Sequence, residues 1–476
     1  MLKIIKLNKI NQSYRIYNNT YRTLCTTNNN NSNNNGVYDI VIVGGGLVGS
    51  AMACSLGNNN NTKHLKVALI ESSPIQTVNE TTSNKIPDIR TISFNHQTID
   101  LFKSIGVWDT IESTKRVNPF NQVRVWDTSG FEGIHFKDNN DIMGYIIENK
   151  VAVSSLLEKA NSFENVDIIS PLTVKSLENY NPNTSTTTNI LPCLKLSNDK
   201  DLHAKLIIGA DGGNSIIKKQ LKLNSVGRNY NQRAVVCTIK LGKSDHNDTL
   251  FQRFLTTGPI ALLPLADGYA NIIWSTNNLH ANYLLELDDN SFLEQLKNSF
   301  LSSVPTNNNS VFDALSSVFN LNPSGLSGNE IYVPPIESIV SKRASFPLRI
   351  DHTFQYTMPR ICFIGDASHI VHPMAGQGVN LGMADVKALT QMIEQSVQSG
   401  YDIGDAMMLK RFEEERKPEN VKMMLSIDTL FNIFTNNSIA VTALRNFGMS
   451  FLNHVPILKN LIVGVSKGNS ILNNIK

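Results

Sequence analysis

YDIVIVGGGLVGS, residues 38–50, leads from an apolar β-strand pattern through a glycine-rich turn into a helical pattern. A second apolar run, KVALIE, follows the helix and ends at Glu71, about 20 residues beyond the last glycine of the turn. A strand, a helix and a second strand in this order predict a βαβ unit with parallel strands. The stretch therefore predicts an α/β protein with a Rossmann-like domain.

The glycines of the turn, Gly44, Gly46 and Gly49, have the spacing GxGxxG. The first permits the tight turn, the second lets the backbone approach a pyrophosphate, and the third lets the helix pack against the strand. The phosphates would lie at the positive helix N-terminus, and Glu71 would accept hydrogen bonds from ribose hydroxyls. A glycine-rich turn that arose by chance is the alternative, and the motif alone does not distinguish NAD from FAD.

Length and composition limit the protein class. The chain has 476 residues, 41% of them hydrophobic and 17% charged, which is enough apolar material for a multi-part folded protein. The net charge is only +3, and residues 1–36 hold five bases and no acid: Lys3, Lys6, Lys9, Arg15 and Arg22. The rest of the chain is therefore not basic, which disfavours a nucleic-acid partner.

Cysteine use and hydropathy exclude further classes. The five cysteines are scattered, with no CxxC pair and no Cys/His cluster at zinc spacing, so we expect neither a disulfide framework nor a metal site. No run of 18 or more uncharged apolar residues occurs, which argues against a spanning helix. Any membrane contact is expected to be peripheral. The cysteines are Cys25, Cys54, Cys193, Cys237 and Cys362.

Residues 1–36 are basic, free of acid, and run into an asparagine tract before the first strand. This composition is typical of a mitochondrial transit peptide, although the helical amphipathicity is imperfect because Leu7 and Ile10 intrude on the basic arc. A disordered basic tail is the alternative. We expect import into the mitochondrion.

Two later motifs, GADGGNSIIKKQ at 209–220 and CFIGDASHIVHPMAGQGVNLGMAD at 362–385, each follow an apolar strand. Together with GxGxxG they occur in the order GxGxxG, DG and GD, and in this the chain resembles the class A aromatic-ring flavin monooxygenases. The resemblance covers residues 38 to about 395 and implies that the dinucleotide is FAD. Lys218 departs from the pattern, because the family often has Arg there, and this makes direct reduction by NAD(P)H less secure.

The resemblance implies a role for each matching residue. The glycines of the first motif and Glu71 would hold the adenosine half of FAD, and Asp366 would accept hydrogen bonds from the ribityl hydroxyls. The segment from Gly376 to Asn380 would pass beneath the isoalloxazine, with helix N–H groups facing the ring. The implied cofactor-binding residues are Gly44, Gly46, Gly49, Glu71, Arg90, Asp211, Gly212, Asp366, Gly376, Gly378 and Asn380.

Within the class, the segments 87–109, 258–265 and 365–386 are similar to the ubiquinone-biosynthesis hydroxylases, and best to the mitochondrial ones. This implies 5-hydroxylation of 3-polyprenyl-4-hydroxybenzoate with O₂, through a flavin hydroperoxide. It also implies electrons from ferredoxin and its reductase, and an assembly with other coenzyme Q biosynthesis proteins, peripheral on the matrix side of the inner membrane. Arg90 would contact the FAD phosphates, unless it is an ordinary surface arginine.

The three motifs lie on separate stretches, so the Rossmann-like FAD-binding domain is expected to be interrupted by an inserted β-sheet substrate domain. The expected parts are a transit peptide (1–36), FAD-binding segments (37–115, 150–225 and 345–395), substrate-domain strands (116–149), the substrate domain (226–344) and a helical C-terminal region (396–476). The apolar C-terminal helices are expected to pack on the core, with a membrane-facing surface as the alternative.

No residue is assigned to proton transfer. His369 and His372 flank the expected flavin loop, but hydrogen bonding within the loop is the favoured interpretation for both. Arg343 and Arg349 are expected to be solvated surface charges. The cofactor would therefore carry the reaction. An NAD-dependent dehydrogenase, another flavin-dependent aromatic hydroxylase and a non-catalytic FAD-binding scaffold remain as alternatives.

Overall fold

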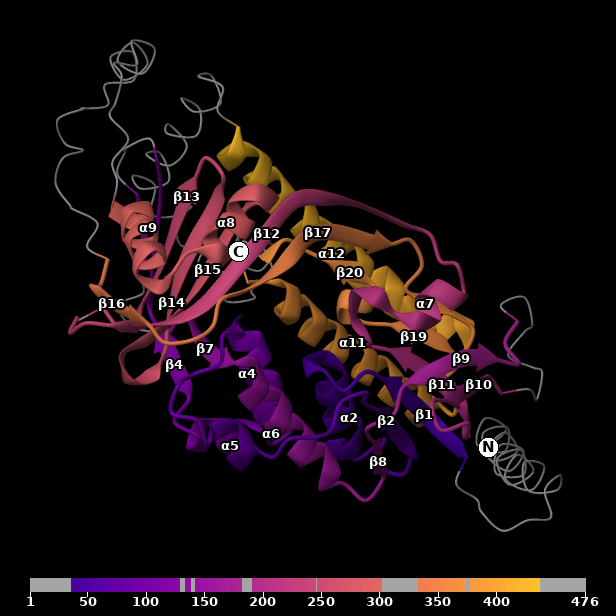
Figure 1. Cartoon of the computed structure of the whole chain (residues 1–476). Coiled ribbons are helices and arrows are strands. Elements are labelled where there is room, and N and C mark those ends of the chain that lie inside the picture. Colours follow the sequence, from indigo (N-terminus) through magenta and orange to yellow (C-terminus); the bar gives the residue numbers. More distant parts are fainter. Residues whose placement is uncertain are drawn as a thin grey trace, which may run out of the picture.

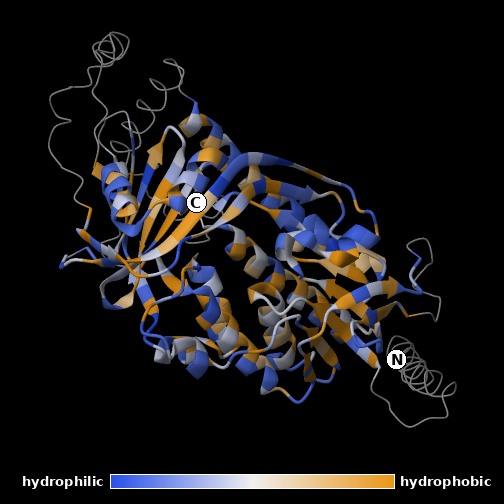
Figure 2. Ribbon diagram, viewed as in Figure 1, coloured by the Kyte–Doolittle hydropathy of each residue, from blue (hydrophilic) through white to orange (hydrophobic). Residues whose placement is uncertain are grey.

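Two large β-sheets and a small one make up the computed structural model, with helices between and around them (Figure 1). The structure describes residues 36–128, 133–137, 142–181, 191–244, 246–301, 333–373 and 376–436. The expected transit peptide lies outside the described residues, apart from Gly36, and so does the C-terminal region beyond residue 436. Apolar residues run along the strands of both large sheets (Figure 2).

The eight-stranded sheet carries the predicted βαβ unit. Its central strands are parallel because helices connect them across the sheet faces. Two antiparallel strands, β9 (Val174–Glu178) and β10 (Cys193–Leu196), extend it beside β11. The main order is β18 (Thr357–Met358), β19 (Ile361–Phe363), β11 (Asp201–Gly209), β1 (Val37–Val43), β2 (Val67–Ile70) and β8 (Val166–Ile169).

Helices cover this sheet and supply its largest hydrophobic core. Helix α2 (Leu47–Asn58) is buried almost throughout, packed against α6 (Asn149–Asn161) and α11 (Gly378–Ser399). Shorter helices lie between the strands: α3 (Val78–Thr82), α4 (His96–Ser104), α5 (Trp108–Ser113) and α7 (Ile216–Gln220).

The nine-stranded sheet is mostly antiparallel and forms the inserted part. Helices α8 (Asn278–Glu286) and α9 (Asp289–Leu301) pack on one of its faces, with Phe292 and Leu296 in the core between them. The order is β20 (His369–Ile370), β17 (Ala344–Thr353), β12 (Ser225–Leu241), β15 (Tyr269–Asn277), β14 (Gly258–Pro264), β13 (Thr249–Leu255), β5 (Gln122–Asp127) and β6 (Ile134–Lys137), with β16 (Ile336–Ile339) beside β12.

The strand pairing corrects two of the expected boundaries. Within 116–149, only β5 and β6 join the substrate sheet; β4 (Val117–Phe120) and β7 (Gly144–Glu148) pair with β3 (Thr91–Phe94) in a three-stranded sheet. Strand β17, at the start of the segment expected to belong to the FAD-binding part, pairs with β12 instead. Pairing partners far apart in the chain decide both points, and strand patterns do not identify such partners.

Helix α12 (Ala406–Thr435) connects the two large sheets, since it contacts α11 and β18 near its start and β13 near its end. Asp405 caps it by accepting hydrogen bonds from the N–H groups of Met407 and Met408. Among the helices that the structure describes, none is long and apolar enough to cross a membrane.

Candidate active site

The three sequence motifs meet at one edge of the eight-stranded sheet. Val43 lies opposite both Ile70 and Gly209 in the register, and Gly209 lies opposite Phe363. Because these strands are parallel, the residues that follow them emerge at the same edge. The GxGxxG, DG and GD motifs, separated by more than a hundred residues along the chain, therefore converge, as their shared cofactor in the resembling family implies, at the usual place for a ligand in an open α/β sheet.

The glycine turn has the shape that a phosphate cradle needs. Gly44 has φ +106°, and a Cβ there would lie 2.5 Å from the Ala210 carbonyl oxygen. A Cβ on Gly49 would lie 1.9 Å from the Gly44 carbonyl oxygen. At Gly46, the N-cap of α2, a Cβ would meet no described atom within 4 Å. Two of the glycines thus serve close packing within the protein, while the third borders open space beside a helix N-terminus.

Glu71 lies at the same turn and already contacts it. One carboxylate oxygen accepts a hydrogen bond from the Gly45 N–H at 2.8 Å, and the other accepts one from the Ser73 N–H at 2.7 Å. A carboxylate has further lone pairs, so it can still accept from a sugar hydroxyl.

The DG motif is held by its own helix. Asp211 accepts a hydrogen bond from the Ile216 N–H at 2.9 Å, and its other oxygen is buried without a partner among the described residues. Burial raises the pKa of Asp211. Lys218 points away from this site, because its ammonium binds Asp351 at 3.1 Å and Thr353 at 3.4 Å. The lysine that departs from the family pattern thus joins α7 to β17.

Asp366 belongs to a short 3₁₀ turn, Gly365–Ala367, and lines a large cavity. The surrounding protein desolvates the carboxyl and raises its pKa, against the charges of His369, Arg349 and Arg90. Both arginines line the same cavity. The expectation that Arg349 is a solvated surface charge is wrong, because its side chain is half-buried and lines the cavity. Its position on a strand of the inserted sheet was not readable from local sequence.

Arg343 was also expected to be a solvated surface charge, and this expectation is wrong because its side chain makes structural contacts. It donates hydrogen bonds to the carbonyl oxygens of Leu284 and Leu287 and lies over the ring of Phe292. Arg343, directly before β17, therefore ties the start of this strand to the C-terminal end of α8.

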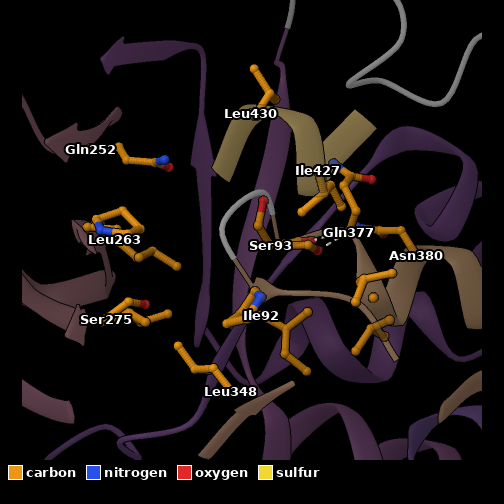
Figure 3. A pocket seen from close by; sticks show the side chains of 18 of the residues that line it. Ile92, Ser93, Gln252, Leu263, Ser275, Leu348, Gln377, Asn380, Ile427 and Leu430 are labelled. Atoms are coloured by element: carbon orange, nitrogen blue, oxygen red, sulfur yellow. Dashed lines mark hydrogen bonds between the residues drawn. The ribbon is translucent and has the colours of Figure 1, made fainter. Parts of the chain in front are cut away.

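The glycine loop before α11 borders the cavity (Figure 3). Gly376 has φ +61°, which a residue with a side chain rarely adopts, and Gln377 is the N-cap of α11. The Asn380 amide donates to the carbonyl oxygens of Ser93 (2.9 Å) and Gly376 (3.2 Å). Its oxygen accepts from Asn95 N–H and Thr98 Oγ1. Since this side chain is fully used within the protein, Asn380 can meet a cofactor only through its backbone.

The cavity has a volume of about 1700 Å³ and extends from this loop to the nine-stranded sheet. Phe434 of α12 stacks on Phe254 of the sheet, with 3.8 Å between ring centroids, at its apolar end. Two polar side chains from the sheet, Gln252 and Ser275, line the cavity (Figure 3), and the Gln252 amide makes no side-chain hydrogen bond to any residue that the structure describes. Apolar lining residues include Phe120, Val123, Val125, Phe136, Leu250, Leu263, Ile273, Ile427 and Leu430.

His369 takes part in a buried ionic cluster. Its Nε2 lies 2.6 Å from Asp385, whose carboxylate also accepts hydrogen bonds from Arg416 (2.9 Å), Asn420 (3.2 Å) and the Gly365 N–H (3.1 Å). Burial would raise the pKa of Asp385, but the charges and hydrogen bonds of His369 and Arg416 outweigh it and lower the pKa to about 2. The cluster fixes the GD loop between α11 and α12, which agrees with a structural role for His369.

His372 is fully buried, and burial lowers its pKa to about 4, partly opposed by the Asp428 carboxylate. It stays neutral near pH 7, which agrees with the structural interpretation. Among the described residues, no group of three or more His, Cys, Asp or Glu side chains could hold a metal ion.

Comparisons with known proteins agree with this geometry. The model of the FAD binding domain family matches residues 37–268 and 329–425. The chain is 70% identical to the mitochondrial ubiquinone biosynthesis monooxygenase COQ6 of Dictyostelium discoideum, over 99% of each chain. It is 37% identical to the protein of the same name in Danio rerio, over 88% of this chain and 87% of that one.

Solved structures share the fold. The FAD-dependent monooxygenase PqsL of Pseudomonas aeruginosa aligns with a TM-score of 0.64 at 17% identity, covering 86% of this chain and all of that one. The p-nitrophenol 4-monooxygenase PnpA of Pseudomonas putida aligns with a TM-score of 0.65 at 15% identity, covering 91% and 99%. At these identities the likeness concerns the fold alone.

Proposed function

The chain belongs to the family of mitochondrial ubiquinone-biosynthesis monooxygenases with an FAD binding domain, and from that premise we propose which reaction it performs and which residues serve it. The substrate is a polyprenylated phenol, 3-polyprenyl-4-hydroxybenzoate, hydroxylated at ring position 5 with O₂. The enzyme is thus an FAD-dependent aromatic-ring monooxygenase of ubiquinone biosynthesis.

The residues present fit FAD. The open side of Gly46 and the N-terminus of α2 suit the pyrophosphate, and Glu71 suits the adenosine ribose. Asp366 would accept hydrogen bonds from the ribityl hydroxyls, and Arg90 would contact the phosphates. The backbone from Gly376 to Asn380, at the start of α11, would face the isoalloxazine.

The same fit extends to the DG motif, where Gly212 has φ +74° and Asp211 keeps one buried oxygen without a described partner. When bound, FAD supplies the redox chemistry and the activation of O₂. The chain itself binds the cofactor, orients the ring of the substrate and excludes water from the reacting atoms.

One observation carries the proposal: a single cavity joins the glycine loop beneath the expected flavin ring to an apolar sheet face. Aromatic and aliphatic side chains of β5, β13, β14 and α12 line its far end, where a prenyl tail would be buried. The phenol head would lie between Gln377 of the glycine loop and the polar side chains Gln252 and Ser275, which face that loop from the sheet across the cavity. A tail in the apolar end would also displace water from the cavity.

The test is oxygen uptake by the purified protein with a reductant and a prenylated 4-hydroxybenzoate, with mass spectrometry of the product. We expect flavin absorbance near roughly 450 nm and a product with one added hydroxyl at position 5. A colourless protein would favour an NAD-dependent dehydrogenase, and a yellow protein that consumes no O₂ would favour a non-catalytic scaffold. A hydroxyl at another ring position would contradict the proposed step.

The electron source is proposed to be ferredoxin with its reductase. Lys218 supports this choice. It stands where the family often has an arginine, and its ammonium is engaged in an ion pair with Asp351, so it is not available to bind NAD(P)H. Stopped-flow reduction of the bound flavin should be at least about tenfold faster with reduced ferredoxin than with NAD(P)H, a difference of ~1.4 kcal/mol in barrier. Faster reduction by NADPH would contradict it.

The location is the mitochondrion, and we place the protein on the matrix side of the inner membrane, peripherally bound with other coenzyme Q biosynthesis proteins. Support for membrane contact comes from Leu425 and Leu430 of α12, which are 62% and 44% exposed beside the cavity that would take a lipid-like substrate. Carbonate extraction of isolated mitochondria should release the protein. Retention in the membrane pellet, or release with soluble matrix proteins before carbonate, would contradict peripheral binding.

A further inference from the structure

Strand β12 contains a two-residue bulge at the cavity. Asn229 lies opposite Arg349, but the next paired residue, Gln232, lies opposite Leu348, so that Tyr230 and Asn231 are extra. Asn231 has φ +54°, and its N–H donates to the Asn229 side-chain oxygen at 2.9 Å. Bulges next to active sites commonly redirect a side chain. Here the redirected side chain is Tyr230.

The Tyr230 ring joins three parts of the molecule that are remote in sequence. It meets the ring of His372, from the GD loop, edge to face at 5.0 Å between centroids. It also meets Phe431, from α12, at 4.5 Å, and Phe431 in turn lies 5.2 Å from His372. His372 is fully buried within this contact, so the ring of Tyr230 limits where the GD loop can lie.

The hydroxyl of Tyr230 fixes the ring. It donates to Asp428 Oδ1 of α12 at 2.7 Å, and the same oxygen accepts from the Arg228 guanidinium at 2.6 Å. Arg228 lies over the Tyr230 ring, 5.0 Å from its centroid. Burial, and then the hydrogen bond and charge of Asp428, raise the pKa of Tyr230, so the hydroxyl remains a donor at neutral pH.

The far side of the same loop faces the expected flavin. Pro373 follows His372, and its carbonyl oxygen accepts from the Gly376 N–H at 3.0 Å, which closes the turn into α11. Ile427 and Leu430, which flank Asp428 within the same turn of α12, line the substrate cavity. A shift of the Tyr230–Asp428 pair would therefore move the flavin loop relative to the wall that holds the substrate.

We propose that Tyr230, held by Asp428, is a positioning residue of this enzyme: through His372 it sets the distance between the flavin ring and the substrate ring. The inference rests on the proposed function, because it concerns oxygen transfer between those two rings. Oxygen transfer is sensitive to such placement, since a displacement of about 1 Å can cost on the order of a hundredfold in rate.

Tyr230→Phe tests the proposal, because it removes the hydrogen bond to Asp428 and keeps the ring. The matched control is Tyr180→Phe, which removes a 3.0 Å hydrogen bond to the Pro359 carbonyl oxygen in the turn between β18 and β19, away from the cavity. Both variants should retain wild-type flavin content and melting temperature within a few degrees of each other. Only Tyr230→Phe should lower the fraction of consumed O₂ that appears as hydroxylated product, by about fivefold, at unchanged KM.

A double variant, compared with the two single variants, tests whether Tyr230 and Asp428 act as a pair. If the pair acts together, Tyr230→Phe with Asp428→Asn should reduce product per O₂ no further than the larger single effect. Equal product per O₂ in Tyr230→Phe and Tyr180→Phe would overturn the proposal. So would additive losses, or a loss explained by missing flavin.

The flavin spectrum separates this proposal from the proposed function. The visible absorbance of bound flavin depends on its surroundings and needs no turnover, so Tyr230→Phe should shift the band and the reduction potential even if the prenylated substrate is not hydroxylated. An inactive wild type with a Tyr230-dependent spectrum would overturn only the function. An active wild type with an unchanged Tyr230→Phe spectrum and unchanged product per O₂ would overturn only the positioning role.

Discussion

The two large sheets use their strands in different ways. The eight-stranded sheet offers its carboxyl edge, where backbone turns and single carboxylates from three motifs meet. The nine-stranded sheet offers a face, where side chains from β5, β13, β14 and β15 build one wall of the cavity. The edge depends on the conformation of a few glycines, and the face depends on the sum of many apolar contacts. Single substitutions should therefore be far more damaging at the edge.

The largest effect is expected for Gly49→Ala, compared with Gly46→Ala. The new Cβ at position 49 would lie 1.9 Å from a backbone oxygen, and such overpacking costs about 3 kcal/mol of unfolding free energy. At position 46 the protein leaves room, so Gly46→Ala should fold normally and lose only FAD affinity. Denaturant unfolding and flavin titration of both variants check this. Equal stability of the two variants would contradict the division of roles.

Asp366→Ala should weaken FAD binding by about 1.5–3 kcal/mol, because the ribityl hydroxyls lose a charged acceptor. The fold should be little changed, since Asp366 makes no hydrogen bond to the part of the chain that the structure describes. Flavin retained after dialysis measures the effect, with the exposed Asp199→Ala as control. Flavin occupancy equal to that of the control would place the ribityl chain elsewhere.

His372, buried where the GD loop meets β12 and α12, should make the unfolding free energy depend on pH. His372 has a pKa of about 4 when folded, so below its ordinary value of about 6.5 the unfolded chain binds a proton that the folded chain does not. Unfolding free energy should fall by about 2 kcal/mol between pH 6.5 and pH 5 from this residue.

His372→Gln should remove that part of the pH dependence while lowering stability at pH 7. Chemical denaturation at several pH values measures it. The same slope in variant and wild type would show that His372 does not carry the effect.

The smallest effect is expected on the sheet face. Gln252→Leu should raise KM for the prenylated phenol about fivefold, since one neutral hydrogen bond to the head is lost, with little change in flavin content. The exposed Gln391→Leu on α11 is the control. Unchanged KM with a head-group substrate would mean that the phenol lies away from β13.

Much of the edge could be predicted from sequence. The GxGxxG turn, the position of Glu71 at the end of a strand, and Ser215 at the start of a helix are local features, and the structure confirms them. Convergence of the motifs was implied by the resemblance to the flavin monooxygenases, and the structure explains it, because the parallel strands present their ends at a common edge.

The cavity-facing side of the nine-stranded sheet, and its contacts with the GD loop and α12, could not be predicted in this way. That β17 pairs with β12, so that Arg349 enters the cavity, depends on a partner more than a hundred residues away. Likewise, the Asn380 side chain hydrogen-bonds to Ser93 of β3 and Thr98 of α4, and these partners lie almost three hundred residues away in the sequence. The bulge at Tyr230 is invisible in strand periodicity, because it is defined only against the neighbouring strand.

The buried Asp385 cluster affects how the protein is made. Gly365 and His369 obtain their fixed positions from the Asp385 carboxylate, whose cationic partner Arg416 and amide donor Asn420 leave the ribosome after the whole nucleotide-binding sheet. A nascent chain that ends before residue 416 carries Asp385 without Arg416, and removing one partner of a buried ion pair is strongly destabilising. Tight flavin incorporation should therefore wait until α12 has been made as far as Asn420, and a stop codon before residue 416 should yield colourless protein although all the residues proposed to bind the cofactor have been synthesised.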